Sequence, residues 1–243
     1  MEIKVEQGSI EASAADTLIV NLFEGVTAPG GATGALDRAL GGAISDLIAG
    51  GDVKGKAGEV AVIYPRGAVG ARRVLVVGLG KAEAFDVEGV RRASAAAIKR
   101  ARDLNAQHVA TIVHGAGIGG LDAAAAAQAT IEGALLATYR FAAQKQREAT
   151  NEIASLTIVE RDAARLDAIR HGAGLGEAVA GGVALARDLV NMPPNVATPT
   201  RLAEQAREIA AARGLAVTVG DRAWAAERHM GAFLAVAQGA GEP

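Results

Sequence analysis

The 243-residue chain has no cysteine, which excludes disulfide bonds and cysteine-ligated metal sites but does not by itself fix the compartment. Aromatic residues make up only 3% of the chain, although half of all residues are apolar. Much of that apolar half is alanine, which predicts helices that approach one another closely through small side chains. No charge of one sign dominates, because 25 basic and 27 acidic residues leave a net charge of -2. No global field therefore favours nucleic acid or an anionic membrane as a partner.

Long hydrophobic runs and targeting signals are also missing. The start, Met1 to Val5, has neither a basic region nor an apolar region of the kind found in signal peptides. The most alanine-rich run, residues 121–137, is interrupted by Asp122, Gln128 and Glu132, so it does not qualify as a membrane span. These absences predict a soluble, cytoplasmic protein without a membrane partner.

What the chain does contain is an alternation of strand-like and helix-like patterns. Apolar and β-branched runs predict strands at residues 3–5, 17–22, 59–63, 73–77, 108–114 and 156–160. Helical spacing predicts helices at 34–48, from Asp86 as N-cap to about 104, and from the glycine-rich turn after 114 to about 144. The order predicts an α/β fold, with a mixed β-sheet flanked by helices on both faces.

The remainder of the chain is organised around a rigid connector. Residues 162–191 have helical spacing but contain five glycines, which is tolerable only if tight packing compensates. Pro193 and Pro194 must end that helix near Asn191, and Thr198 followed by Pro199 predicts the start of the next one. Beyond it, residues 215–219 read as a strand, Asp221 as a helix cap, and 233–236 as a further apolar element, which together predict an α-β-α-β beginning of a second domain.

One glycine-rich loop fits a nucleotide-binding pattern. It follows a predicted strand, precedes a predicted helix, and consists of Gly115, Ala116, Gly117, Ile118, Gly119 and Gly120. No acidic residue stands about 20 positions on at the end of a second strand, where a dinucleotide site requires one to bind the ribose. The favoured interpretation is that these glycines serve a tight turn and close packing.

Other candidate sites fail on spacing. Gly78 to Lys81 lacks the P-loop spacing and reads as a turn at a strand end. The four histidines, His108, His114, His171 and His229, show no metal-ligand spacing, and no serine lies in a G-x-S-x-G turn. Lys54 and Lys56 read as a solvated basic loop. The sequence therefore provides no catalytic residue and no metal ligand.

Several motifs, in order along the chain, resemble the leucyl aminopeptidases, also called cytosol aminopeptidases. They are Gly51-Asp52 with Lys54-Gly55-Lys56 and Gly58-Glu59, Val76 to Lys81, Glu132-Gly133-Ala134 through Tyr139-Arg140-Phe141, Arg187 to Asn191, Pro193-Pro194-Asn195, Thr198-Pro199, Met230 to Val236, and Gly239 to Pro243. The resemblance covers nearly the whole chain. It implies a macro-domain-like N-terminal domain at 1–161, a linker helix and proline elbow at 162–197, and an incomplete start of the peptidase domain at 198–243.

The resemblance also implies a function for the family enzyme. That enzyme is a hydrolase that releases N-terminal residues from peptides, leucine preferred, with two divalent metals (manganese, zinc or magnesium), a lysine and an arginine. In the family these groups follow a Gly-Ser-x-Glu-Pro-Pro segment, and the sequence ends at Pro243 inside the matching segment. We therefore expect no metal in these residues, no activity from them alone, and a monomer or weak oligomer with exposed apolar surface around Phe233 to Val236, although the family forms hexamers.

A binding module is the alternative function. The loop from Ala116 to Gly120 resembles the diphosphate loop of macro domains, which bind ADP-ribose. Macro domains usually have an aromatic residue where this chain has Gly119, which leaves the ligand without a stacking partner. A third alternative is a purely structural module that docks its own catalytic half.

Overall fold

The computed structural model describes residues 1–117, 119–141, 151–236, 238 and 239, which cluster into two units, Met1–Leu185 and Ala186–Pro243. The first unit is built on six strands: β1 (Glu2–Gln7), β2 (Thr17–Phe23), β3 (Val60–Ile63), β4 (Arg73–Gly80), β5 (His108–Thr111) and β6 (Ser155–Glu160). Their order across the sheet is β1-β6-β5-β2-β4-β3. All neighbours are parallel except β3 and β4, which are antiparallel, so the predicted mixed sheet is confirmed.

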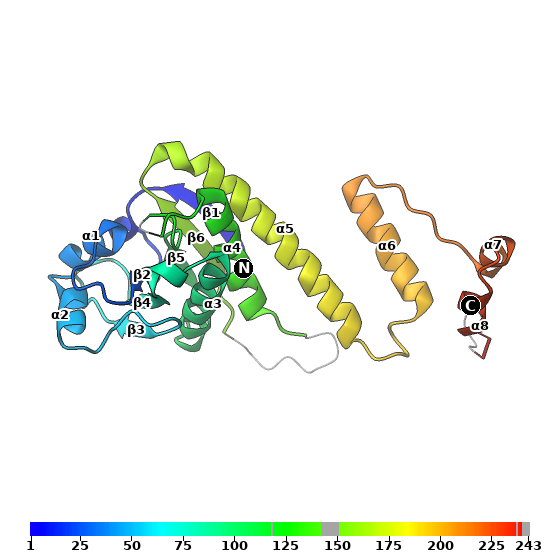
Figure 1. Ribbon diagram of the computed structural model, residues 1–243, viewed down its shortest axis with the longest axis horizontal. Coiled ribbons are helices and arrows are strands. Elements are labelled where there is room, and N and C mark those ends of the chain that lie inside the picture. The colour runs from blue at the N-terminus through cyan, green and yellow to red at the C-terminus, as the bar shows by residue number, and fades with distance from the viewer. Residues whose placement is uncertain (118, 142–150, 237, 240–243) are drawn as a thin grey trace. The chain divides into compact units, whose positions relative to one another are not determined.

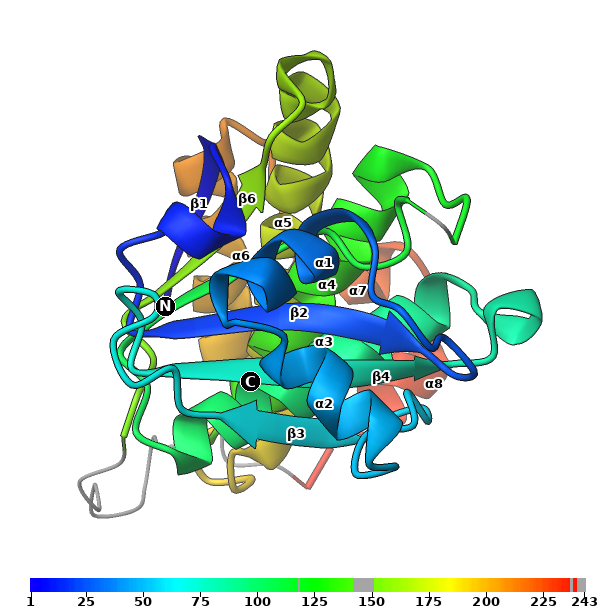
Figure 2. The same cartoon turned by 90° about the vertical axis from the view of Figure 1, so that its left-hand side faces the viewer.

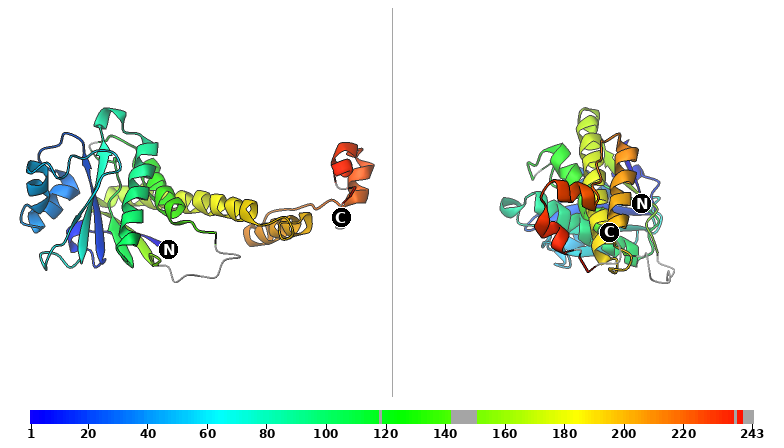
Figure 3. Two further views of the ribbon diagram at one scale, coloured as in Figure 1. Left: turned by 90° about the horizontal axis from the view of Figure 1, so that it is seen from below. Right: turned by 90° about the vertical axis from the view of Figure 1, so that its right-hand side faces the viewer.

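Alternation along the central strands divides the core into two layers. Leu18, Val20 and Leu22 of β2 pack with α1 (Gly31–Ala39) and α2 (Ala43–Ala49), as Figure 2 shows from that face. Ile19 and Phe23 point to the other face, which is covered by α3 (Val87–Asp103), α4 (Ala123–Thr138) and the first half of α5 (Leu166–Asn191); these helices are labelled in Figure 1. The left panel of Figure 3 shows the sheet edge-on between these two helical layers. The predicted helices on both faces are confirmed.

Asp16 ties the three central strands together where they begin. Its side-chain oxygen Oδ2 accepts hydrogen bonds from the backbone N–H groups of Gln107 and His108 at 2.8 and 2.7 Å, at the start of β5. Its backbone carbonyl accepts from Arg72 and Arg73 at the start of β4. Burial raises the pKa of Asp16, but the hydrogen bonds from Thr17, His108 and Gln107 outweigh it, so the pKa is lowered overall.

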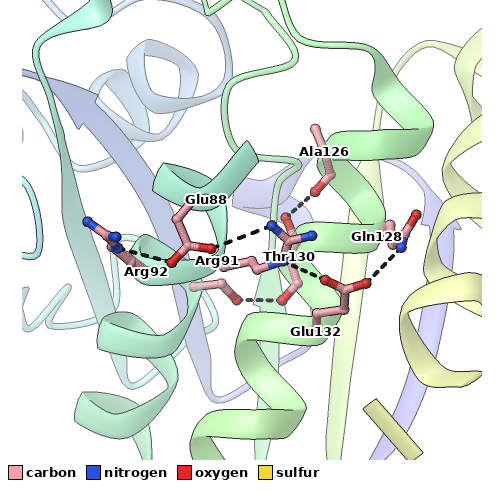
Figure 4. A network of polar contacts seen from close by, with 8 residues as sticks. Glu88, Arg91, Arg92, Ala126, Gln128, Thr130 and Glu132 are labelled. Atoms are coloured by element: carbon pink, nitrogen blue, oxygen red, sulfur yellow. Dashed lines mark hydrogen bonds and ion pairs between the residues drawn. The ribbon is translucent and has the colours of Figure 1, made fainter. Parts of the chain in front are cut away.

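Helices α3 and α4 pack through small residues, as the composition predicts. A methyl group at Gly133 would lie 2.3 Å from the carbonyl oxygen of Arg91, so only glycine allows this approach. A polar network crosses the same contact (Figure 4): Arg91 binds the carboxylate of Glu132, and Gln128 donates to its other oxygen at 2.7 Å. The hydrogen bond to Glu132 is the main reason that the pKa of Arg91 is raised. This pairing makes the burial of the Glu132 carboxylate tolerable.

Helix α5 is continuous despite its glycines, and two of them pack as the sequence requires. A methyl group at Gly172 would lie 2.1 Å from the carbonyl oxygen of Ala124, and one at Gly176 would lie 2.7 Å from that of Gln128, both on α4. Nothing lies within 4 Å of the corresponding position at Gly174, Gly181 or Gly182. Close packing on α4 therefore accounts for Gly172 and Gly176 only.

The second unit begins within α5 and continues through α6 (Pro199–Arg213), α7 (Arg222–Glu227) and α8 (Gly231–Val236). The predicted caps are confirmed, because Thr198 accepts from the N–H of Arg201 and Asp221 from that of Trp224. Phe233 and Val236 are 68% and 88% exposed, which agrees with the expected exposed apolar surface. Among the described residues no helix combines the length and apolarity needed to cross a membrane.

Five expected elements differ from the structure in their boundaries or in their type. The helix expected at 34–48 is two helices, since Gly41 and Gly42 adopt positive φ between them. The strand expected at 108–114 ends at Thr111, and the helix after it ends at Thr138; residues 142–150 lie outside the described residues. Residues 215–219 form no strand and are exposed, because the described part of their unit offers no strand to pair with. Residues 233–236 are helical, and so short an apolar run does not distinguish helix from strand.

The α4–α5 contact predicts opposite effects for two alanine substitutions on one helix. Gly172→Ala should lower the free energy of unfolding by more than about 1 kcal/mol, because the new methyl group collides with backbone. Gly174→Ala, at an exposed position with open space, should raise it by about 0.5–1 kcal/mol through the better helix propensity of alanine. Urea unfolding measures both, and a shift of the same sign in both variants would contradict the packing.

The network in Figure 4 predicts unequal roles for adjacent arginines. Arg91→Met should cost about 1–3 kcal/mol of stability, because it leaves the Glu132 carboxylate, whose side chain is 5% exposed, with Gln128 alone. Arg92→Met is the matched control, since Arg92 pairs with Glu88 at 77% exposure and such pairs contribute less than about 1 kcal/mol. Equal losses in thermal or urea unfolding would show that Glu132 does not depend on Arg91.

Candidate binding cavity at the carboxyl ends of the parallel strands

A cavity of about 390 Å³ opens where β1, β2, β5 and β6 end. The connection that follows β2 crosses the α1–α2 face on its way to β3 and β4, whereas β5 continues through α4 on the other face to β6. Connections that diverge from adjacent parallel strands leave a crevice at their carboxyl ends, where open α/β sheets bind ligands. The gap between β2 and β5 is such a point.

The start of α1 forms one wall of the cavity. Gly30 is its N-cap and has no side chain to bind the first N–H groups, and the wall runs from Pro29 to Thr33. Thr33 donates from Oγ1 to the carbonyl oxygen of Asn21 at 2.8 Å, which ties the helix start to the end of β2. Within the described residues, the N–H groups of Ala32 and Thr33 have no hydrogen-bond acceptor. They make this wall a donor surface with partial positive charge.

Two ion pairs stand at another part of the rim. Arg161 binds Oε1 of Glu11 at 2.9 Å, and Arg165 binds Glu160 at 3.3 Å. Arg165 also donates to the carbonyl oxygen of Ala116 at 2.8 Å, which holds the glycine-rich loop against β6. The second oxygen of Glu11, Oε2, is buried without a partner in the described part of the chain. Both arginines are thus engaged, while one carboxylate oxygen is not.

The glycine-rich loop that the sequence singles out lies beside this cavity, with Gly115 and Gly117 in its lining. Gly115 has φ +77, and a methyl group there would lie 2.4 Å from the ring of Phe85, which itself packs edge-on against Phe23. Gly119 lies against the carbonyl of Gly115, and Gly120 has φ +64. Ile118 lies outside the described residues. The loop geometry agrees with the favoured interpretation, since turn conformation and packing account for Gly115, Gly119 and Gly120.

His114 precedes this loop and is 1% exposed, with Nδ1 3.0 Å from the side-chain nitrogen of Asn21. Burial lowers its pKa to about 4. His114 lies beyond the end of β5, which ends at Thr111. His108 does stand at the other end of β5, where Nδ1 lies 2.9 Å from Oγ of Ser155.

The remaining sequence candidates are not brought together. The Lys54 and Lys56 loop is an ordinary turn, whose N–H groups are bound by Glu59. Gly78 lies within β4, which ends at Gly80 with φ +80, as expected of a strand end. In the described parts of the chain, no three acidic or histidine residues come together as a metal site would require.

The residues that shape the cavity were missed by the sequence analysis. They are Glu11, Asn21, the stretch from Pro29 to Thr33, Glu160, Arg161 and Arg165. Each lies near the carboxyl end of a predicted strand or in the segment after it, and that position is the signal that could have found them. The signal is usable only once the strands are known to be parallel and adjacent.

Comparison with known proteins identifies the family of this chain. The family model of the N-terminal domain of the cytosol aminopeptidase family matches residues 19–148. The chain belongs to the cytosol aminopeptidase family. The model of the catalytic domain of the cytosol aminopeptidase family matches residues 184–243. Both matches agree with the resemblance read from the motifs.

The probable cytosol aminopeptidase of Roseiflexus castenholzii is 40% identical in an alignment 242 residues long, which covers 98% of this chain and 46% of that protein. The chain spans about half the length of the curated relatives it matches. A tomato leucine aminopeptidase mutant, K354E, is similar at 27% identity and TM-score 0.83, over 100% of this chain and 48% of that one. The bottromycin maturation enzyme BotP in complex with Mn is 29% identical at TM-score 0.72, over 94% of this chain and 43% of that one.

Macro domains share the fold of the first unit. A Trypanosoma brucei macrodomain solved in complex with ADP aligns at TM-score 0.55 and 14% identity, over 70% of this chain and 68% of that one. This likeness extends to the fold alone. The expected macro-domain-like architecture is thereby confirmed.

The buried imidazole of His114 predicts a pH effect. Its pKa lies near 4 in the folded protein and near 6.5 when unfolded, so its contribution to stability is complete above pH 6.5 and is lost as the pH falls toward 4. His114→Gln should therefore reduce the loss of stability between pH 7 and pH 4.5, by up to about 3 kcal/mol.

Urea unfolding at the two pH values measures that difference, and His171→Gln, at an exposed position, is the control. An unchanged pH dependence in His114→Gln would show that this imidazole is not kept neutral by burial.

Proposed function

We propose that the chain is the N-terminal portion of an aminopeptidase that uses divalent metal ions to release N-terminal residues, leucine preferred, from peptides. The observation that carries this proposal is the succession of two family matches, to the N-terminal domain at 19–148 and the catalytic domain at 184–243. The names of the relatives, which are cytosol and leucine aminopeptidases, support the reaction class.

Manganese is supported by the BotP complex, and zinc and magnesium are the alternatives that the family resemblance implies. The described residues do not fit a metal site, since they contain no cluster of three potential ligands. No catalytic step is therefore assigned to a residue of this chain. A divalent metal acts in such enzymes by polarising the scissile carbonyl and lowering the pKa of a bound water.

The division into 1–161, 162–197 and 198–243 is part of the proposal, with the first segment as an accessory module. A peptide substrate, a hexameric whole enzyme and a cytoplasmic location complete it, and the name of the relatives supports the location. We propose that the 243 residues alone are monomeric or weakly associated. Nucleotide binding through Gly115 to Gly120 is less well supported, because the loop geometry has a conformational explanation and both nearby arginines are paired.

A chimera tests the proposal directly. This chain should replace the segment that it matches in the Roseiflexus castenholzii relative, which is 46% of that protein. The chimera should hydrolyse leucine p-nitroanilide when manganese or zinc is present and lose activity with a chelator, whereas the 243-residue chain alone should show no turnover. Circular dichroism and gel filtration establish that both proteins are folded.

Two results would contradict the proposal. A folded chimera without activity, beside an active parent enzyme, would count against the aminopeptidase assignment. Chelator-sensitive turnover by the 243-residue chain alone would place metal ligands among its own residues.

A further inference from the structure

Helix α5 carries a row of exposed apolar side chains beside the row that packs on α4. Leu175, Val179 and Val183 recur every four residues and are 43%, 44% and 39% exposed. Residues four apart lie on one side of a helix, so these three side chains form a continuous ridge, the α5 ridge. Gly172 and Gly176, which contact α4, belong to a neighbouring row.

A groove of small residues runs along the other side of this ridge. The groove, which we call the α5 groove, consists of Gly174, Ala178 and Gly182, and all three are exposed. Glycine inside a helix is destabilising relative to alanine. At Gly133 and Gly172 the chain uses it where the backbone of another helix lies within reach of a methyl group. The α5 groove has the same composition, yet no described residue lies within 4 Å of a methyl group added at Gly174 or Gly182.

The distribution of charge along α5 also indicates a covered helix. Between Gly172 and Ala186 the only charged or polar side chain is that of Glu177. A surface helix normally has charged residues on the side away from its core, whereas a helix that is apolar nearly all round is buried. Glu177 lies on the side of the helix opposite the α5 ridge. A partner of this face is therefore itself apolar and uncharged where it makes contact.

The family matches indicate which partner covers this face. The match to the catalytic domain begins at residue 184, directly after Val183 and inside α5. The chain spans about half the length of its curated relatives, so most of their catalytic half has no counterpart in it. A domain attached to the same polypeptide is held at a high effective concentration, so one helix face is enough to dock it.

We propose that the α5 ridge and the α5 groove dock a helix from that catalytic half. Ridges of side chains four residues apart pack into such grooves in the commonest class of helix contact. The small residues of the groove let the two backbones approach as closely as those of α4 and α5. The inference rests on the proposed function only in that the complete enzyme contains a catalytic half.

The absence of cysteine allows a test that needs no peptidase assay. Val179→Cys places a thiol on the α5 ridge, and Glu177→Cys, exposed on the opposite side, is its control. In the 243-residue chain both thiols should react readily with a maleimide. In the chimera with the Roseiflexus castenholzii relative, Val179→Cys should react at least about tenfold more slowly, because only local opening exposes a docked thiol. Glu177→Cys should be little changed, and peptide mass spectrometry reads the label at each position.

A second pair of variants tests the groove. Ala178→Leu fills it with a large side chain, and Glu177→Leu adds the same side chain on the opposite side of the helix. Neither should shift the urea midpoint of the 243-residue chain appreciably, because both positions are exposed and leucine is a good helix former. In the chimera with Val179→Cys, Ala178→Leu should restore labelling to nearly the rate of the isolated chain, whereas Glu177→Leu should not.

The outcomes separate this inference from the proposed function. Protection of Val179→Cys in the chimera, released by Ala178→Leu alone, supports docking even if the chimera is inactive. Labelling as fast in an active chimera as in the isolated chain would overturn docking and leave the aminopeptidase assignment intact. Protection that Ala178→Leu does not release would overturn close packing at the groove.

Two further results would assign the face to another occupant and overturn the inference. Protection already present in the 243-residue chain at every concentration would mean that its own second unit covers the face. Protection that is lost on dilution, in the chain or in the chimera, would mean that a second copy covers it.

Discussion

The junction at Asp16 is the constraint on which the first unit depends. One residue there receives hydrogen bonds from the first backbone groups of both strands that flank β2. Because the side-chain period of a strand is two residues, a shift of one residue would exchange the two faces of β2 and expose half of the core. Fixing the start of the strands fixes the register of every apolar residue along them.

Alignment at the amino edge also determines what meets at the carboxyl edge. Parallel strands point their carboxyl ends to the same edge of the sheet, so the residues after β1, β2, β5 and β6 converge there although they are far apart in sequence. Glu11, Asn21, Gly115 and Arg161 become neighbours of one cavity by this route. The switch in connection between β2 and β5 keeps that edge open, because their helices leave over opposite faces of the sheet.

Close backbone contacts between α3, α4 and α5 hold together the helical layer on one face of this sheet. Gly133 lets α4 approach α3, and Gly172 and Gly176 let α5 approach α4, each at a distance that a methyl group would prevent. The scarcity of aromatic residues follows from this geometry, since helices this close leave no room for large side chains. One larger, charged side chain is nevertheless buried at the α3–α4 contact, that of Glu132. Arg91 and Gln128 bind its carboxylate there and offset the cost of burying it.

The sequence by itself determined the order of elements, the mixed sheet, the caps at Asp86, Thr198 and Asp221, and the family, because these depend on local patterns and on motifs in order. It did not determine the break at Gly41 and Gly42, where two positive φ angles interrupt an apolar pattern that continues across them. It was wrong about strands at 215–219 and 233–236, since a strand exists only when another strand pairs with it. The cavity was decided by the tertiary structure alone: Glu11 and Arg161 are 150 positions apart, and only the parallel pairing of β1 with β6 brings them into contact.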